Sequence, residues 1–338
     1  MPVIVYAARM PIPTYSDILG AAERIAGRAV RTPLLHAPLL SEETAARVFL
    51  KPECLQRTGS FKFRGAWNAV SRLGEKRASG VVACSSGNHA QGLAEAARLA
   101  GIPATIVMPS DAPPVKRERT AASGARIVPY DRASEDRDAI AAAIAAETGA
   151  TLVHPYDNAD VISGQGTVGL EIAHDLDALG LAPDLAFVPC GGGGLTAGVT
   201  LALTERFPAV RVNAVEPAGF DDYGRSLAAG AILRNERLTG SVADALLSPS
   251  PGEIGFAINR ERLAGAVTAT DDEAMNAVGY AFDRLRLVLE PGGAVALAAV
   301  LAHSAELRGR TVVVVLSGGN VADEMLAEAL RRYRSASA

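Results

Sequence analysis

The sequence predicts an α/β protein with mostly parallel sheets flanked by helices. Two observations support this prediction. Short runs rich in β-branched residues alternate with Ala-rich helical segments, and several of these runs end in Ser, Gly or Pro clusters that lead into a helix. Eight or more such runs in 338 residues indicate two sheets, and this length allows two lobes, each with its own core.

The predicted strands follow one another along most of the chain. They are residues 47–51, 80–86, 104–109, 125–130, 150–155, 185–190, 210–217 and 311–319. In open parallel sheets, ligands collect at the carboxyl ends of the strands, so we expect functional residues there. The last eight residues, RRYRSASA, are typical of a tail.

The stretch LQRTGSFKFRGAWNAV, residues 55–70, allows two interpretations. In the first it is an ordinary helix start, in which Ser60 caps the helix, Trp67 and Val70 face a core, and Lys62 is exposed to solvent. In the second, Lys62 is a functional amine, enclosed by Phe61 and Phe63 at the positive end of a helix dipole. The stretch by itself does not decide between them.

Three strand ends carry further chemistry. In CSSGNHAQG, residues 84–92, small polar residues precede a helix, so main-chain N–H groups and Asn88 can meet an anionic group; a plain Ser-rich helix cap is the alternative. In PCGGGGLTAG, residues 189–198, four glycines can curl their N–H groups into a phosphate-binding nest. The third, VVVVLSGGN at 312–320, is a buried strand that delivers Ser317 to the same edge.

Neither common nucleotide-binding signature fits the glycine run. No Lys-Ser/Thr pair follows it, and its spacing matches a dinucleotide-binding turn only loosely, so a nicotinamide-binding protein is a weak alternative. The uncharged stretch from Leu185 to Thr204 approaches the length of a membrane span. Pro189 and the four glycines interrupt it, which favours a buried strand, a loop and then a helix.

Charge and composition narrow the classes of partner. Lys and Arg number 33 against 37 Asp and Glu, a net charge of -4, which argues against nucleic acid and anionic membranes as partners and favours small molecules. Three widely spaced cysteines suit reduced thiols, and the first 13 residues lack the pattern of a signal peptide. We therefore expect a cytoplasmic protein.

Five motifs in order carry a resemblance to a known family. TGSFKFRGA, SSGNHAQG, GGGGL, LEPGGA and LSGGN together resemble the serine/threonine dehydratase and serine racemase group of fold-type II pyridoxal-phosphate (PLP) enzymes, from about Tyr15 to Leu330. The resemblance implies a two-lobed, tryptophan synthase β-like architecture and a homodimer. Residues 1–75 and 154–338 would form the large PLP-binding domain, and residues 76–153 a small mobile domain that closes over the substrate.

The resemblance also implies the cofactor site. Lys62 would form a Schiff base with PLP, Asn88 would bond its 3-hydroxyl, and Ser317 would face its pyridine nitrogen. Because a serine there leaves the ring a weaker electron sink than an aspartate would, loss of a leaving group from Cβ is favoured over transamination. The implied cofactor-binding residues are Phe61, Lys62, Asn88, Gly191, Gly192, Gly193, Gly194, Leu195, Glu290 and Ser317.

The implied reaction is dehydration and deamination of a small L-3-hydroxy amino acid, threonine or serine, to a 2-oxo acid and ammonia. Lys62 would take the Cα proton. Ser86, opposite Lys62, permits serine racemase activity as an alternative, and Arg137 could pair with a second carboxylate, which makes 3-hydroxyaspartate dehydratase another. An N-cap for Ser86 and an exposed helical position for Arg137 are the simpler interpretations. The implied substrate-binding residues are Ser85, Asn88, His89 and Arg137.

A divalent cation site is implied as well. Glu216, the carbonyl of Phe220 and Asp222 match the family's oxygen ligands, which suit Mg²⁺, Ca²⁺ or Mn²⁺; solvated acidic residues in a turn are the alternative. The chain departs from the family at Ala245, where "ADG" is usual, which leaves open how closely the backbone there approaches the cofactor. A non-catalytic amino-acid sensor and a cysteine or cystathionine β-synthase-like enzyme fit less well.

Overall fold

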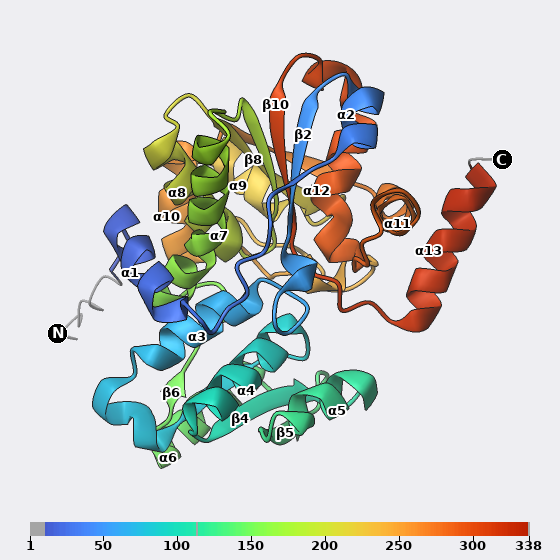
Figure 1. Ribbon diagram of the computed structural model, residues 1–338. Helices are drawn as coiled ribbons and strands as arrows, with labels where there is room; N and C mark the ends of the chain where they lie inside the picture. The colour runs from blue at the N-terminus through green and yellow to red at the C-terminus, as the bar shows by residue number, and fades with distance from the viewer. Residues whose placement is uncertain (1–10, 113, 337–338) are drawn as a thin grey trace.

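The computed structural model describes residues 11–112 and 114–336, and in it the chain forms two sheets with helices on their faces (Figure 1). The larger sheet has the strand order β1-β2-β10-β7-β8-β9 and the smaller one β5-β4-β3-β6. Every strand pair is parallel except β1 with β2. The predicted α/β class with mostly parallel sheets is confirmed.

The six-stranded sheet is buried on both faces. Its strands are β1 Leu35–His36, β2 Arg47–Pro52, β7 Leu185–Pro189, β8 Arg211–Pro217, β9 Gly265–Ala269 and β10 Thr311–Leu316. In β10, Val312 and Val314 pack in one apolar cluster while Val313 and Val315 pack in another, so alternate side chains serve opposite faces. A strand buried on both sides needs such an unbroken apolar run, VVVVL.

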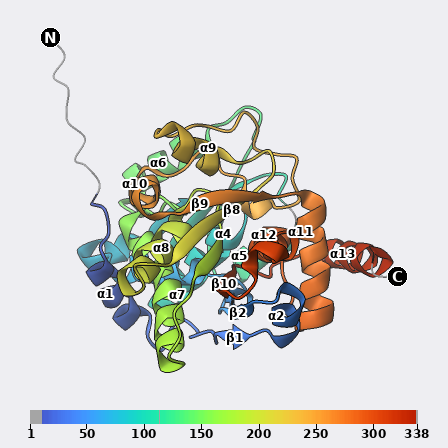
Figure 2. The same cartoon turned by 90° about the horizontal axis from the view of Figure 1, so that it is seen from above.

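Two groups of helices cover this sheet. On one face lie α1 Tyr15–Ile25, α7 Ala159–Ala178, α8 Gly194–Arg206 and α10 Glu253–Arg262; α11 Asp271–Tyr280 and α12 Pro291–Ala302 lie on the other, with α13 Asp323–Ala336 against α11. The short helices α2 Pro38–Thr44 and α9 Asp222–Ala229 follow β1 and β8. Seen from above, α13 projects from one side of the molecule (Figure 2).

The four-stranded sheet comprises β3 Val81–Cys84, β4 Ala104–Pro109, β5 Arg126–Tyr130 and β6 Thr151–Leu152. The helices associated with it are α3 Lys62–Ser71, α4 Asn88–Ala100, α5 Pro114–Ala122 and α6 Arg137–Thr148. Helices α3 and α4 share an apolar cluster with this sheet, and α3 also contacts α7 of the other layer. The whole sheet lies within residues 76–153; the predicted division into domains at these boundaries stays a prediction.

All eight predicted strands are present, and the stretch 185–204 is strand, loop and helix as expected. Two strands were not predicted: β1 has only two residues, and β9 reads GAVTA, with small side chains that give little periodicity. The predicted C-terminal tail is wrong as far as Ala336, because α13 extends to that residue. The expectation about a signal peptide concerns mainly residues 1–10, outside the described residues. None of the described helices has the length and apolar composition that a membrane crossing needs.

Candidate active site

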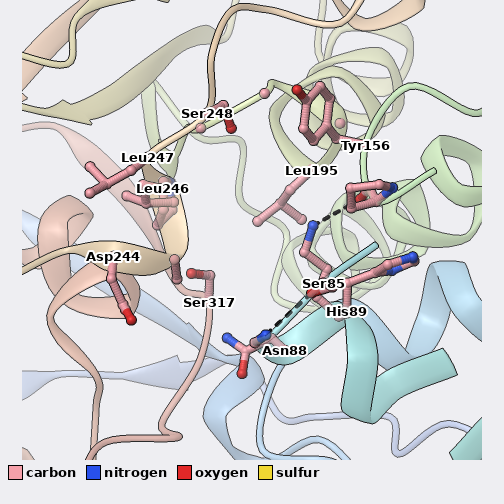
Figure 3. A pocket seen from close by; sticks show the side chains of 18 of the residues that line it. Ser85, Asn88, His89, Tyr156, Leu195, Asp244, Leu246, Leu247, Ser248 and Ser317 are labelled. Atoms are coloured by element: carbon pink, nitrogen blue, oxygen red, sulfur yellow. Dashed lines mark hydrogen bonds between the residues drawn. The ribbon is translucent and has the colours of Figure 1, made fainter. Parts of the chain in front are cut away.

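A cavity of about 210 Å³ lies where the two sheets meet, at the carboxyl ends of β3 and β7. Every residue expected to bind cofactor or substrate lines it: Phe61, Lys62, Ser85, Ser86, Asn88, His89, Arg137, Gly191, Gly192, Gly193, Gly194, Leu195, Glu290 and Ser317. Figure 3 shows Ser85, Asn88 and His89 on one side of this cavity and Asp244 and Ser317 on the other. The structure thus brings together residues separated by up to 256 positions in the sequence (61 to 317).

Lys62 is the first residue of α3, and its amine lies in the cavity. Its Nζ donates a hydrogen bond to the Pro155 carbonyl at 2.8 Å and stands 5.1 Å from the centre of the Phe61 ring. Desolvation lowers the pKa of Lys62 to about 8, against an opposing effect of the Glu290 charge. The solvent-exposed interpretation of Lys62 is therefore wrong. A substantial fraction of neutral, nucleophilic amine is present near pH 8.

Ser60 does not cap α3, which corrects the first interpretation of this stretch. Phe61 occupies the N-cap position, and the buried hydroxyl of Ser60 has no hydrogen-bond partner among the described residues. The Phe61 N–H instead donates to the carbonyl of Ser317 at 3.1 Å. This bond ties the start of α3 to the end of β10, so Lys62 and Ser317 are held on the same cavity. Trp67 and Val70 are buried, as expected.

The glycine run forms a tight loop before α8. Gly193 has φ +86°, a left-handed conformation, and a Cβ there would lie 2.2 Å from the Tyr223 ring. A Cβ on Gly192 would lie 2.3 Å from the Tyr156 ring. Only glycine satisfies both positions, because the aromatic rings already occupy the side-chain space. The loop therefore presents main-chain groups and the N-terminal end of α8 to the cavity, as anion binding requires.

A chain of hydrogen bonds links three polar side chains beside Lys62. Asn88 Nδ2 donates to Glu290 Oε1 at 2.5 Å, and Asn88 Oδ1 accepts from Asn320 Nδ2 at 2.7 Å. Burial raises the pKa of Glu290 to about 7, and the hydrogen bond from Asn88 opposes this rise. A contact between Asn88 and a ligand hydroxyl stays a prediction; in this structure both ends of its amide are occupied.

The start of α4 forms the opposite wall. Gly87 N donates to Ser85 Oγ at 3.2 Å, and Ser86 lines the cavity beside it. His89 is 2 % exposed; burial lowers its pKa to about 3, so the ring is neutral. Its Nε2 lies 2.9 Å from the Val153 carbonyl, which can only accept, so Nε2 carries the hydrogen. Nδ1, which has no hydrogen-bond partner in residues 11–112 and 114–336, can then only accept. The His89 ring is therefore unsuited to bind a carboxylate, which leaves its main-chain N–H for that role.

Arg137 begins α6 at the edge of the cavity. Its side chain is 43 % exposed, and its Nε lies 3.8 Å from Asp138 Oδ2, a long separation that leaves the guanidinium available to a ligand. The Cys84 thiol donates to the Arg137 carbonyl at 3.0 Å and fixes α6 against the end of β3.

Several cavity residues were not predicted. Tyr156, Lys116, Asp244 and Asn320 all line it. Tyr156 follows the predicted strand 150–155 directly, and Asn320 ends the motif LSGGN, so their positions at strand ends could have indicated them. Lys116 lies in a polar segment without a local signal, whereas Asp244 stands in the "ADA" that replaces the usual "ADG", which could have indicated it. Ala245, at the departure from "ADG", also lines the cavity.

Comparisons with known proteins agree with this geometry. The family model described as "Pyridoxal-phosphate dependent enzyme" matches residues 25–318. The chain belongs to this family. The L-threo-3-hydroxyaspartate ammonia-lyase of Saccharomyces cerevisiae is 42 % identical over 92 % of this chain and 94 % of its own. The protein of the same name from Pseudomonas sp is 43 % identical over 95 % of this chain and 100 % of its own.

Comparison with solved structures indicates the same family and the same fold. A threonine deaminase from T.th. superposes with a TM-score of 0.87 at 43 % identity, over 92 % of this chain and 99 % of that one. Maize serine racemase superposes with a TM-score of 0.88 at 35 % identity, over 97 % of this chain and 99 % of that one. The predicted resemblance to fold-type II PLP enzymes is confirmed, and the chain is an enzyme of the ammonia-lyase group of this family.

The cavity of this PLP enzyme fits its cofactor. A phosphate fits the glycine loop, since Tyr156 and Tyr223 leave only main-chain groups facing it, and an aldehyde fits the desolvated amine of Lys62. Ser317, 4 % exposed, offers an uncharged hydroxyl to a ring nitrogen. The roles of individual residues toward the cofactor stay predictions.

The candidate cation site lies beyond the glycine loop, after β8. Glu216 Oε1 and Oε2 accept the N–H groups of Tyr223 and Gly224 at 2.7 and 2.8 Å, and the buried Asp222 Oδ2 has no hydrogen-bond partner among the residues that the structure describes. Burial raises the pKa of Glu216 to about 8 and of Asp222 to about 6. No group of three or more His, Cys, Asp or Glu suited to a metal occurs among residues 11–112 and 114–336, so a site here needs a carbonyl such as that of Phe220. Neither acid forms an ion pair within the described part of the chain, and two buried carboxyl groups of this kind fit such an ion.

Proposed function

We propose that this enzyme removes ammonia from 3-hydroxyaspartate by PLP-dependent β-elimination, yielding the corresponding 2-oxo acid. Two relatives over 40 % identical are named L-threo-3-hydroxyaspartate ammonia-lyase. The observation in this chain that supports the same substrate is Arg137, a guanidinium on the cavity whose ion pair with Asp138 is long, at 3.8 Å. The expected preference for threonine or serine is less well supported than this alternative.

The distal group distinguishes these substrates. Threonine carries a methyl group and serine a hydrogen where 3-hydroxyaspartate carries a second carboxylate. A guanidinium pairs with a carboxylate through charge-assisted, often bidentate hydrogen bonds, and gains nothing comparable from a methyl group. An Arg at the cavity edge is therefore better suited to the dicarboxylic substrate.

Different residues of the chain carry out different parts of the β-elimination. Bound PLP supplies the electron sink for the electrons left at Cα. The main-chain N–H groups at the start of α4 bind the α-carboxylate. Lys62, about half of whose amine is neutral near pH 8, accepts the Cα proton. The uncharged Ser317 leaves the sink weak, which favours departure of the Cβ hydroxyl.

Serine racemisation is a second candidate, and one observation favours it. Ser86 lines the cavity together with Lys62, so a second proton carrier is available to Cα. Elimination has no need of a second carrier, but racemisation does.

Other features of the enzyme stay proposals. A divalent cation held by Glu216, Asp222 and the Phe220 carbonyl is supported by the buried Asp222 Oδ2, which has no hydrogen-bond partner in the described part of the chain. A homodimer and a cytoplasmic location rest on the sequence and on the resemblance alone.

Side-by-side assays test the substrate. We expect kcat/KM for L-threo-3-hydroxyaspartate to exceed the values for L-threonine and L-serine, and Arg137→Ala to lower that preference by about 10- to 100-fold, as the loss of a charge-assisted hydrogen bond does. Arg132→Ala is the control, because Arg132 pairs with Asp111 and does not line the cavity. A wild type that prefers L-threonine would contradict the proposal.

A further inference from the structure

An ion pair spans the cavity between the two sheet layers. Lys116 Nζ, on α5, donates to Asp244 Oδ2 at 2.7 Å, and Asp244 lies in the 3₁₀ turn Asp244–Leu246 of the other layer. Both residues line the cavity that contains Lys62, and Asp244 is seen at its edge in Figure 3. The partners are 128 positions apart in sequence, so the folded chain alone creates this pair.

The cavity offers few cations to a ligand. Among its described lining residues, the basic side chains are Lys62, His89, Lys116 and Arg137. Lys62 is reserved for the cofactor, and His89 is neutral because burial lowers its pKa to about 3. A second carboxylate in the cavity therefore has two cationic partners, Arg137 and Lys116.

The charges of the pair reach the centre of the site. Burial is the main influence on the pKa of Glu290 and raises it, while the hydrogen bond from Asn88 lowers it. Of the two charges of the pair, Asp244 raises this pKa and Lys116 lowers it. Glu290 is the carboxyl beside Lys62, so both partners lie within electrostatic range of the reacting groups.

The pair is also easy to exchange. The side chains of Lys116 and Asp244 are 28 % and 61 % exposed, and ion pairs this exposed contribute little net stability. Because the existing pair contributes so little, a carboxylate that enters the cavity can replace Asp244 on Lys116.

We propose that Lys116 recognises the second carboxylate of a dicarboxylic amino-acid substrate, and that Asp244 occupies Lys116 until this substrate arrives. Lys116 is then a specificity-determining residue, and Asp244 is its internal competitor. This inference rests on the proposed function, since only a dicarboxylate uses Lys116.

The two partners of the pair should have opposite effects. Removing Lys116 removes a ligand for the substrate carboxylate, whereas removing the charge of Asp244 frees Lys116 for it. An ion pair that merely joins the two layers would give the same effect from either side.

The test compares L-threo-3-hydroxyaspartate with L-threonine, which carries a methyl group in place of the second carboxylate. We expect Lys116→Met to lower the ratio of kcat/KM values, hydroxyaspartate over threonine, by about 10- to 100-fold. We expect Asp244→Asn to raise that ratio by up to about fivefold, the limit for an exposed pair. Lys76→Met, which removes an exposed lysine outside the cavity lining, should leave the ratio unchanged. Equal losses for both substrates, or shifts of the same sign in the two variants, would overturn the inference.

Inhibition by succinate and butyrate separates this inference from the proposed function. Succinate carries a second carboxylate where butyrate carries a methyl group, and inhibition by either acid can be measured without its conversion by the enzyme. If the wild type prefers L-threonine, the proposed substrate fails, and weaker succinate but unchanged butyrate inhibition in Lys116→Met still supports carboxylate recognition. If the wild type prefers hydroxyaspartate and Lys116→Met retains both the substrate ratio and succinate inhibition, only the inference about Lys116 is wrong.

Discussion

The Lys62 amine is enclosed, and its titration can be measured through its reaction with PLP. Its pKa is lowered to about 8, chiefly by desolvation, so the neutral amine fraction rises from about one tenth at pH 7 to about nine tenths at pH 9. We expect the rate of covalent PLP attachment to apoprotein to rise about tenfold over this range and then level off. Absorbance after mixing, from pH 6 to 10, measures it.

Glu290 provides the matched variant for this experiment. Its charge raises the pKa of Lys62, so Glu290→Gln should move the midpoint of PLP attachment to lower pH. An exposed lysine would show no levelling below pH 10. A midpoint near 10 in the wild type would therefore contradict the enclosure of Lys62.

Ser86 decides between elimination and racemisation. If it carries a proton to Cα, Ser86→Ala should reduce conversion of L-serine to D-serine by about 10²- to 10⁴-fold and spare most 2-oxo-acid formation. Chiral chromatography beside a coupled pyruvate assay on the same sample measures both. Ser85→Ala is the control, because Ser85 Oγ accepts from Gly87 N–H and shapes the same loop. Equal loss of both activities in Ser86→Ala would show that Ser86 only maintains the shape of the loop.

At the scale of elements, strands and glycine turns were predictable because their signals are local. A run such as VVVVL is typical of a strand buried on both faces, and four glycines before a helix indicate a main-chain anion site. Contacts between distant segments have no such signal. The Phe61 N–H bond to Ser317, which replaces the expected Ser60 cap, depends on α3 meeting β10.

The same limit applies to the site. The five motifs indicated thirteen residues that line one cavity, because each motif stands at a strand or helix end facing the same edge. Lys116 and Asp244 were not indicated, since each acquires its ion-pair partner only through the tertiary fold. His89 was expected to bind substrate, but the tautomer that makes its ring unsuited to a carboxylate depends on the Val153 carbonyl, which the sequence does not place.

Across the whole molecule, the two buried acids Glu216, at the end of β8, and Asp222, at the start of α9, connect to the cofactor cavity by two routes. Tyr223, whose N–H bonds Glu216, packs its ring against Gly193, and its hydroxyl accepts from Asn259 Nδ2 at 2.7 Å. Asp222 Oδ1 accepts from Asn235 Nδ2 at 2.6 Å, and the same nitrogen donates to the carbonyl of Ser248, a cavity residue. An ion bound there would therefore order both the glycine loop and the opposite cavity wall.

This connection predicts that a divalent cation stabilises the protein as a whole. A ligand that binds only the folded state at a hundredfold excess over its Kd adds about 2.7 kcal/mol, equivalent to about 4 °C in Tm for a chain of this size. We expect Mg²⁺, Ca²⁺ or Mn²⁺ to raise the Tm of the EDTA-treated protein accordingly, and Asp222→Asn to abolish the rise. Asp221→Asn should retain it, because that neighbouring carboxylate is 40 % exposed and pairs with Arg225, while Asp222 is buried. Equal cation responses in both variants would place the ion elsewhere.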